Sequence, residues 1–349
     1  MNVTVHQRPG VYSAYDASSV VSGSGAGKQV GRVAVNAKAA ANEVKIVTSY
    51  DGAVNAFGQG TMAELIRLVL KNGAGSVAAV PIASGEGYGD GFAAREGLED
   101  ITAVICDSTD GDVQKTMKQS VETASANRRE RIAVAAGGAE ETVDELIARA
   151  KALNHERVVL VAPGGVNQNG ETADGLGVAA AVAGAIAGES DPAVPLGGAV
   201  LTGLYGLSGR YSDGEMDRLI LGGVTPVESL AGTIGVVRGV TTRTTTGEAA
   251  DATWRDLTTI RIVDDVIPTL RRALRTKFQR AKNTAQSRGA IRAQVVLELE
   301  NKLSQEIITA YDNVTVTEKA DDPTVCLVEF SFTAAHGLIQ IWLSAHITV

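Results

Sequence analysis

Apolar and polar residues alternate along the last twelve positions of the chain, 338–349. From Ile339 onward the odd-numbered positions are apolar, and the even-numbered positions are mostly polar. The apolar set consists of Ile339, Ile341, Leu343, Ala345, Ile347 and Val349. A period of two over this length is typical of a half-buried β-strand. The pattern therefore predicts an extended terminal strand over 338–349.

A shorter alternation occurs near the N-terminus, where Val3 and Val5 are flanked by polar residues. Two interpretations of these terminal strands remain open. They pair with each other in one intramolecular sheet, or each strand completes the sheet of a neighbouring molecule. The second arrangement is physically accessible because an unpaired sheet edge binds another strand through main-chain hydrogen bonds.

The middle of the chain alternates between apolar runs and helical patterns from about residue 92. Apolar runs at 101–106, 131–136 and 157–162 are separated by helical patterns at 112–127 and 142–153. A helix rich in small residues is predicted over 174–187. Continuous apolar strands separated by helices favour a parallel sheet covered on both faces. We therefore expect a central α/β domain over 92–240, preceded by a small α+β domain over 21–91 and an arm over 1–20.

The last third of the chain has a different pattern, with two long helices followed by strands. Helices are predicted over 263–282 and about 287–310, and strands over 314–316 and 326–332. These elements define an α+β domain over 241–337, which leads into the C-terminal strand over 338–349. The predicted fold class is thus α/β, with a central parallel-sheet domain, a mixed α+β C-terminal domain and extended terminal strands for inter-subunit sheet formation.

Basic residues accumulate on the first of these two long helices. Eight basic residues and no acidic residue lie between Pro268 and Arg292. At about 100° per residue, Arg271, Arg275 and Lys282 project within about 40° of one another, with Arg272 beside them. A solvated helix face explains this pattern, and so does a surface that docks on an acidic partner. We favour the docking surface because the whole chain carries a net charge of −8.

Composition excludes several classes of protein. With 349 residues, 44% of them hydrophobic and 21% charged, the chain is expected to be a soluble protein of two or three domains. Its negative net charge argues against nucleic-acid binding. Two cysteines form no disulfide framework, which favours a reducing compartment. The longest apolar stretch, 178–187, is too short to cross a bilayer, so no membrane insertion is expected.

The sequence contains no recognisable catalytic site. Zinc-protease, nucleophile-elbow and paired-cysteine motifs do not occur. The loop Gly164–Gly170 follows a predicted strand, where α/β enzymes often bind ligands. An α/β enzyme or a ligand-binding homo-oligomer using this loop is therefore the alternative function, although tight helix packing explains its small residues equally well. No cofactor or metal is expected.

Several short stretches, in order along the chain, resemble the contractile tail sheath proteins of phages and R-type bacteriocins, particularly the short diffocin-like sheaths of Gram-positive bacteria. The N-terminal stretch is Arg8-Pro9-Gly10-Val11-Tyr12. The others are Val47-Thr48-Ser49-Tyr50, Leu70-Lys71-Asn72-Gly73-Ala74-Gly75, Ala180-Ala181-Val182-Ala183-Gly184, Gly222-Gly223-Val224-Thr225-Pro226, Val237-Arg238-Gly239-Val240-Thr241-Thr242, Asn283-Thr284 with Ala290-Ile291-Arg292, and Ala345-His346-Ile347-Thr348-Val349.

This resemblance implies a structural protein and no enzymatic activity. Sheath subunits form hexameric rings stacked helically around a tail tube, and the stack contracts to drive the tube through a cell envelope. Their terminal arms interlace with neighbouring subunits. The implied partners are other copies of the chain, the tail tube protein, and the baseplate and tail-terminator proteins. The implied location is the bacterial cytoplasm during synthesis, and then a phage tail or bacteriocin particle that is released on lysis.

Overall fold

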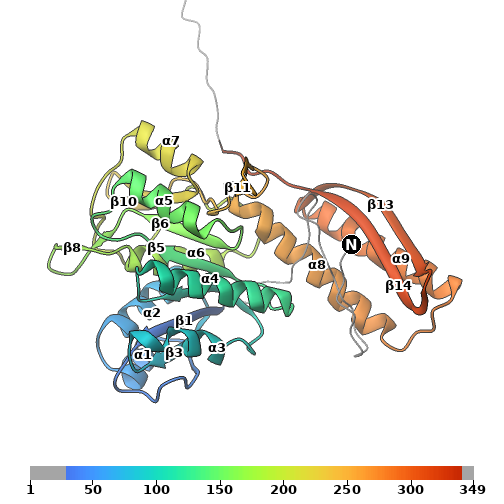
Figure 1. Ribbon diagram of the computed structural model, residues 1–349, viewed down its shortest axis with the longest axis horizontal. Helices are drawn as coiled ribbons and strands as arrows, with labels where there is room; N and C mark the ends of the chain where they lie inside the picture. The colour runs from blue at the N-terminus through green and yellow to red at the C-terminus, as the bar shows by residue number, and fades with distance from the viewer. Residues whose placement is uncertain (1–28, 340–349) are drawn as a thin grey trace, which may run out of the picture.

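An eight-stranded, mostly parallel sheet forms the centre of the molecule (Figure 1). The computed structural model describes residues 29–339. The strand order is β10-β9-β6-β5-β4-β1-β3-β2, and only the outer pairs β2–β3 and β9–β10 are antiparallel. The strands are β1 (Gln29–Val35), β2 (Lys45–Val47), β3 (Ser76–Ile82), β4 (Ile101–Cys106), β5 (Ile132–Ala136), β6 (Val158–Ala162), β9 (Val224–Leu230) and β10 (Thr233–Val236). The predicted parallel sheet is thus confirmed.

Helices cover both faces of this sheet, and a separate hydrophobic core lies on each face. One face carries α1 (Tyr50–Phe57), α2 (Thr61–Lys71) and α6 (Leu176–Gly188). The other face carries α3 (Tyr88–Ala94), α4 (Gly111–Ala126), α5 (Val143–Leu153) and α7 (Asp213–Leu221). Strands covered on both faces are largely apolar, which explains the near-continuous hydrophobic runs in the sequence.

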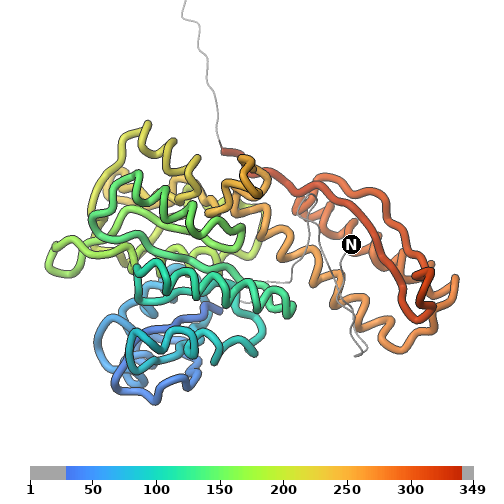
Figure 2. Tube along the Cα trace, in the orientation of Figure 1, coloured from blue at the N-terminus to red at the C-terminus, as the bar shows by residue number. Residues whose placement is uncertain are grey.

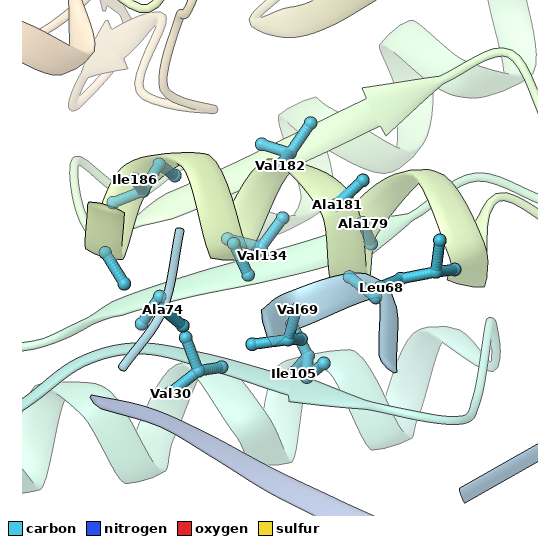
Figure 3. Packing of buried hydrophobic residues seen from close by; sticks show 14 of the residues in the cluster. Val30, Leu68, Val69, Ala74, Ile105, Val134, Ala179, Ala181, Val182 and Ile186 are labelled. Carbon is cyan, nitrogen blue, oxygen red and sulfur yellow. The ribbon is translucent and has the colours of Figure 1, made fainter. Parts of the chain in front are cut away.

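Small residues allow α6 to lie very close to α2 (Figure 3). A Cβ atom at Gly184 would lie 2.4 Å from the carbonyl oxygen of Val69, and one at Gly188 would lie 2.8 Å from Cα of Gly73. Val182 and Ile186 belong to the same hydrophobic core. The run of alanine and glycine in 178–187 is therefore explained by helix packing.

The small N-terminal domain expected over 21–91 has no sheet of its own. β1 pairs with β3 on one side and with β4 on the other, in parallel at both edges. The boundary expected at residues 91 and 92 therefore runs through a single sheet. The sequence pattern of β1 and β3 does not contain the information that these strands belong to the same sheet as β4.

A second lobe contains the mixed α+β structure expected for the C-terminal region. It consists of α8 (Leu257–Phe278), α9 (Ala285–Ser304) and a hairpin of β13 (Ile308–Lys319) and β14 (Asp322–Ala334). Figure 2 shows α8 as the stretch of chain that runs from the central sheet along the whole second lobe. The short elements elsewhere are η1 (Gly85–Gly87), β7 (Gly165–Val166), β8 (Thr172–Ala173), β11 (Thr245–Thr246) and β12 (Ala249–Ala250).

Both long helices differ in length from the prediction. α8 begins six residues earlier than expected and ends at Phe278, before Lys282. Beyond the end of α8, Asn283 and Thr284 make contacts that lead into the next elements. The Asn283 amide donates to the carbonyl oxygen of Pro323 at 2.7 Å, and the Thr284 hydroxyl accepts from the amide of Ser287 as the N-cap of α9.

Candidate interaction surfaces

Helix α8 contributes side chains to the cores of both lobes. Leu257, Ile260 and Val263 belong to the core that covers the central sheet. Val266 and Leu270, one to two turns later, belong to the core of the second lobe. The two lobes therefore share one continuous helix.

Buried polar contacts fasten α8 to the central lobe. The Arg157 guanidinium, next to β6, forms two hydrogen bonds of 2.6 and 2.8 Å with the Asp264 carboxylate. Burial raises the pKa of Asp264 to about 6, and the positive charge of Arg157 opposes this shift. Arg261 donates to the carbonyl oxygens of Val194 and Glu189 at 3.3 and 3.0 Å. These contacts bind α8 to segments far away in the sequence.

Arg271 does not lie on an exposed basic face, contrary to the expectation from helical spacing. Its guanidinium lies 3.1 Å from the Glu130 carboxylate, and its side chain is only 11% exposed. Helical spacing gives the angle between residues on one helix, but not the neighbour against which each face packs. Arg271 therefore contributes to the contact between the lobes.

The other predicted basic residues are exposed and lie toward the far end of the second lobe. Arg272 and Arg275 project from the last turns of α8. Lys282 is also exposed, but it lies in the turn between α8 and α9, so its predicted helical alignment with Arg275 is wrong. Figure 1 shows this end of α8 pointing away from the central sheet. The exposed part of the predicted surface thus consists of Arg272, Arg275 and Lys282.

The β13–β14 hairpin has two open edges in the described part of the chain. It is a two-stranded antiparallel sheet, and neither strand pairs with another strand between residues 29 and 339. Ile308, Val314 and Phe332 pack its inner face onto the helices of the second lobe. A hairpin of this length supported by helices is stable, and its free edges are suited to accept further strands.

The residues predicted to link subunits lie almost entirely outside the described residues. This applies to Val3, Val5, Ile341, Leu343, Ala345 and Ile347. Ile339 is the last described residue; it is 47% exposed and belongs to no strand. Exchange of terminal strands therefore stays a prediction.

A hollow of about 290 Å³ lies beside the last described residues of the chain. Its walls come from Pro195, Gly197 and Gly198, from Val237–Gly239, from the start of α8 and from residues 336–339. An ion pair of 2.8 Å between Arg238 and Asp256 forms part of the lining. No local pattern predicts this hollow, because the residues of its walls are separated by up to about 140 positions.

The loop Gly164–Gly170 is not at the position where doubly wound sheets bind ligands. Ligands bind where the strand order reverses, which in this sheet is between β1 and β4. The loop follows β6, two strands away from β4. At the β1–β4 position, the Asp107 carboxylate accepts hydrogen bonds from the Val35 amide at 3.0 Å and the Tyr88 hydroxyl at 2.8 Å. Side chains of the protein itself thus occupy this position.

Cys106 is poorly suited to act as a nucleophile. Burial raises the pKa of the Cys106 thiol to about 11, so the reactive thiolate is scarce at neutral pH. Within residues 29–339, no group of three or more histidine, cysteine or acidic side chains is placed to hold a metal ion. No helix in the same range is long and apolar enough to span a membrane.

Two family profiles match most of the chain. The phage tail sheath protein central domain matches residues 83–242, and the phage tail sheath C-terminal domain matches residues 249–348. The chain belongs to the phage tail sheath protein family. The first match covers strands β4 to β10 of the central sheet, and the second covers the second lobe. No curated protein sequence matches the chain significantly.

Solved sheath structures share the complete fold. The sheath tail protein from Desulfitobacterium hafniense is 14% identical with a TM-score of 0.70, and the match covers 93% of this chain and 100% of that chain. The anti-feeding prophage helical sheath in the contracted state is 17% identical with a TM-score of 0.73, and the match covers 98% of this chain and 99% of that chain. The contracted sheath complex of the extracellular contractile injection system PVC is 18% identical with a TM-score of 0.70, covering 99% of both chains.

Proposed function

We propose that this sheath protein polymerises as stacked hexameric rings around a tail tube and contracts to drive the tube through a target cell envelope. The observation that carries this proposal is the match of both sheath domains over residues 83–242 and 249–348. Structural neighbours support it, since they include a contracted helical sheath and a baseplate of the anti-feeding prophage. The partners are then other copies of the chain and a baseplate, together with tube and tail-terminator proteins.

The proposed link between subunits is strand exchange onto the β13–β14 hairpin. The terminal alternations that include Val3, Val5 and Ile339 supply the strands, and the hairpin supplies two free edges. Each exchanged strand adds about four or five main-chain hydrogen bonds at about 1 kcal/mol net. Links of this kind, repeated around every subunit, hold the subunits together while their globular bodies rotate.

The proposed contact with the tube is the exposed basic surface formed by Arg272, Arg275 and Lys282. It requires an acidic tube surface, because exposed ion pairs are individually worth about 0–1 kcal/mol and only a repeated array holds a sheath extended. The extended state is then kept by tube contacts, and contraction follows when the subunits exchange them for contacts with one another. Synthesis in the bacterial cytoplasm and release on lysis complete the proposal.

Electron microscopy of the purified protein tests the proposal, because a sheath forms long hollow cylinders even without a tube. Deleting 337–349 or 1–10 should leave soluble monomers with a folded central sheet. Intact cylinders after either deletion would contradict strand exchange.

Substitutions in the C-terminal strand provide a matched control. Changing Ile341 and Leu343 to Asp places charge on the apolar side of the predicted strand, and should prevent cylinder formation. Changing Gln340 and Ser344 to Asp adds the same charge on the polar side, and should leave the cylinders in place. Equal effects of the two pairs would count against a half-buried exchanged strand.

A further inference from the structure

We propose that the contact between Gly337 and Pro195 fixes the direction in which the C-terminal strand leaves the subunit, and that Gly337 is thereby a positioning residue for assembly. This inference rests on the proposed exchange of terminal strands. It concerns the described residues at the root of that strand, 335–339.

The root is held by its backbone more than by its side chains. A main-chain hydrogen bond of 3.1 Å from the Ala335 amide to the carbonyl oxygen of Ile307 fastens the start of the root to the second lobe. Beyond it, Leu338 and Ile339 are 74% and 47% exposed. Side chains this exposed hold the chain only weakly in one direction, so the position of the root depends on what its backbone touches.

The backbone at Gly337 lies directly against the ring of Pro195. A Cβ atom at Gly337 would lie 2.8, 2.9 and 3.1 Å from three ring carbons of Pro195. Real Cβ atoms essentially never approach other atoms to less than 3.0 Å. A proline ring has no rotatable side chain that could move aside. Any side chain at position 337 therefore forces the root to move.

Pro195 itself is firmly placed at the junction of the two lobes. Its neighbour Leu196 is buried in the core of the central lobe, and Ala193 packs against the core of the second lobe. The Gly198 amide donates to the carbonyl oxygen of Val236 at 2.7 Å, and Arg261 of α8 donates to the carbonyl oxygen of Val194. A bulkier residue at 337 therefore displaces the root and leaves Pro195 in place.

The hollow beside the root gives the displaced chain somewhere to go. It is lined by Pro195, Gly337, Leu338 and Ile339. The root can therefore turn without unfolding either lobe. A change at Gly337 should alter the direction of the strand and spare the stability of the subunit. In a polymer linked by exchanged strands, that direction sets how well the strand meets the hairpin of the next subunit.

The test compares cylinder formation by Gly337→Ala, Pro195→Gly and the double variant in the full chain. Gly337→Ala should raise the critical concentration for cylinders about tenfold, or change their helical rise and rotation. Its thermal unfolding should match that of the wild-type protein. Pro195→Gly removes the opposing ring, so the double variant should recover wild-type cylinders. Gly214→Ala is the matched control, because a Cβ there meets nothing within 4 Å.

Two results would overturn the inference. Wild-type cylinders from Gly337→Ala would show that the contact does not set the direction, and a double variant as defective as Gly337→Ala would show that Pro195 is not the obstacle. If Pro195→Gly does not fold, Gly337→Ala and Gly337→Val test the inference instead. The defect in cylinder formation must then be larger for valine than for alanine. Deletion of 337–349 distinguishes a failure of this inference from a failure of the proposed strand exchange. If strand exchange does not link the subunits, cylinders still form after the deletion. If only the Gly337 contact is unimportant, the deletion still prevents cylinders.

Discussion

Two buried arginines, Arg32 and Arg261, differ in how their charges are accommodated. Arg261 donates to two carbonyl oxygens. Arg32, in the central strand β1, is fully buried, and its guanidinium nitrogens have no hydrogen-bond partner among the residues that the structure describes. Burial lowers the pKa of Arg32, and the negative charge of Asp107 opposes this shift. Arg32 is thus a desolvated charge without the hydrogen bonds that normally compensate it.

Replacing Arg32 by methionine should therefore leave the free energy of unfolding unchanged or raise it by about 1–4 kcal/mol, since well-packed apolar residues often match or exceed buried charges. Arg261→Met is the control, and should lower the free energy of unfolding by about 1–3 kcal/mol because it leaves carbonyl groups without donors. Urea unfolding of the two variants measures both effects. A larger loss for Arg32→Met than for Arg261→Met would disprove this account.

The contact partners of individual side chains are the part of the structure that the sequence predicts least well. Spacing placed Arg271 correctly on a helix, yet its partner Glu130 lies 141 positions away. Arg157 and Asp264 are separated by 107 positions, and neither has a distinctive sequence context. Such contacts depend on how two elements pack, which a local pattern does not contain.

Elements with strong patterns were predicted well. β4 was expected over 101–106 and found there, and the small residues of α6 indicated a closely packed helix. The elements α1, α3, α7 and β9 were not predicted. Glycine is frequent in α3, yet Gly91 is required there, since a Cβ would lie 2.6 Å from the Val33 side chain. From the sequence alone, a glycine required for close packing cannot be distinguished from a glycine required for a turn.

The contact between α6 and α2 gives a prediction for this element. Gly184→Ala should lower the free energy of unfolding by about 1–3 kcal/mol, because the added methyl group overlaps the Val69 carbonyl oxygen. Gly289→Ala, on the exposed side of α9 with nothing within 4 Å, should instead raise it by about 0.5–1 kcal/mol. Thermal or urea unfolding compares the two. Equal shifts would mean that α6 moves away from α2 without cost.

At the scale of the whole molecule, the exposed basic residues Arg272, Arg275 and Lys282 lie at the end of the second lobe and belong to none of the hydrophobic cores. Reversing Arg272, Arg275 and Lys282 to Glu should therefore spare folding and polymerisation. Assembly in the extended form on the tube should fail, leaving bare tubes beside contracted, empty cylinders. Raising the salt concentration should shift the wild-type protein weakly in the same direction, because exposed charges are screened within about 10 Å at 0.1 M.

The control reverses Lys115, Lys151 and Arg210, which are exposed on the central lobe and give the same change in net charge. This variant should still build extended tails. Full-length extended tails from the first variant would rule out tube docking by this surface. Arg271 is left unchanged in both, because a glutamate there would face the buried carboxylate of Glu130.

The order of strands in the central sheet has a consequence for synthesis on the ribosome. The first described strand, β1, lies inside the sheet, and β3 and β4 take their places on its two sides. β5, β6, β9 and β10 then join one after another at the growing edge. Each of these strands leaves the ribosome after the neighbour that will receive it, and chains fold from the N-terminus as they emerge. The edges of β13 and β14, which we propose accept strands from neighbouring subunits, are synthesised only after all eight strands of the central sheet.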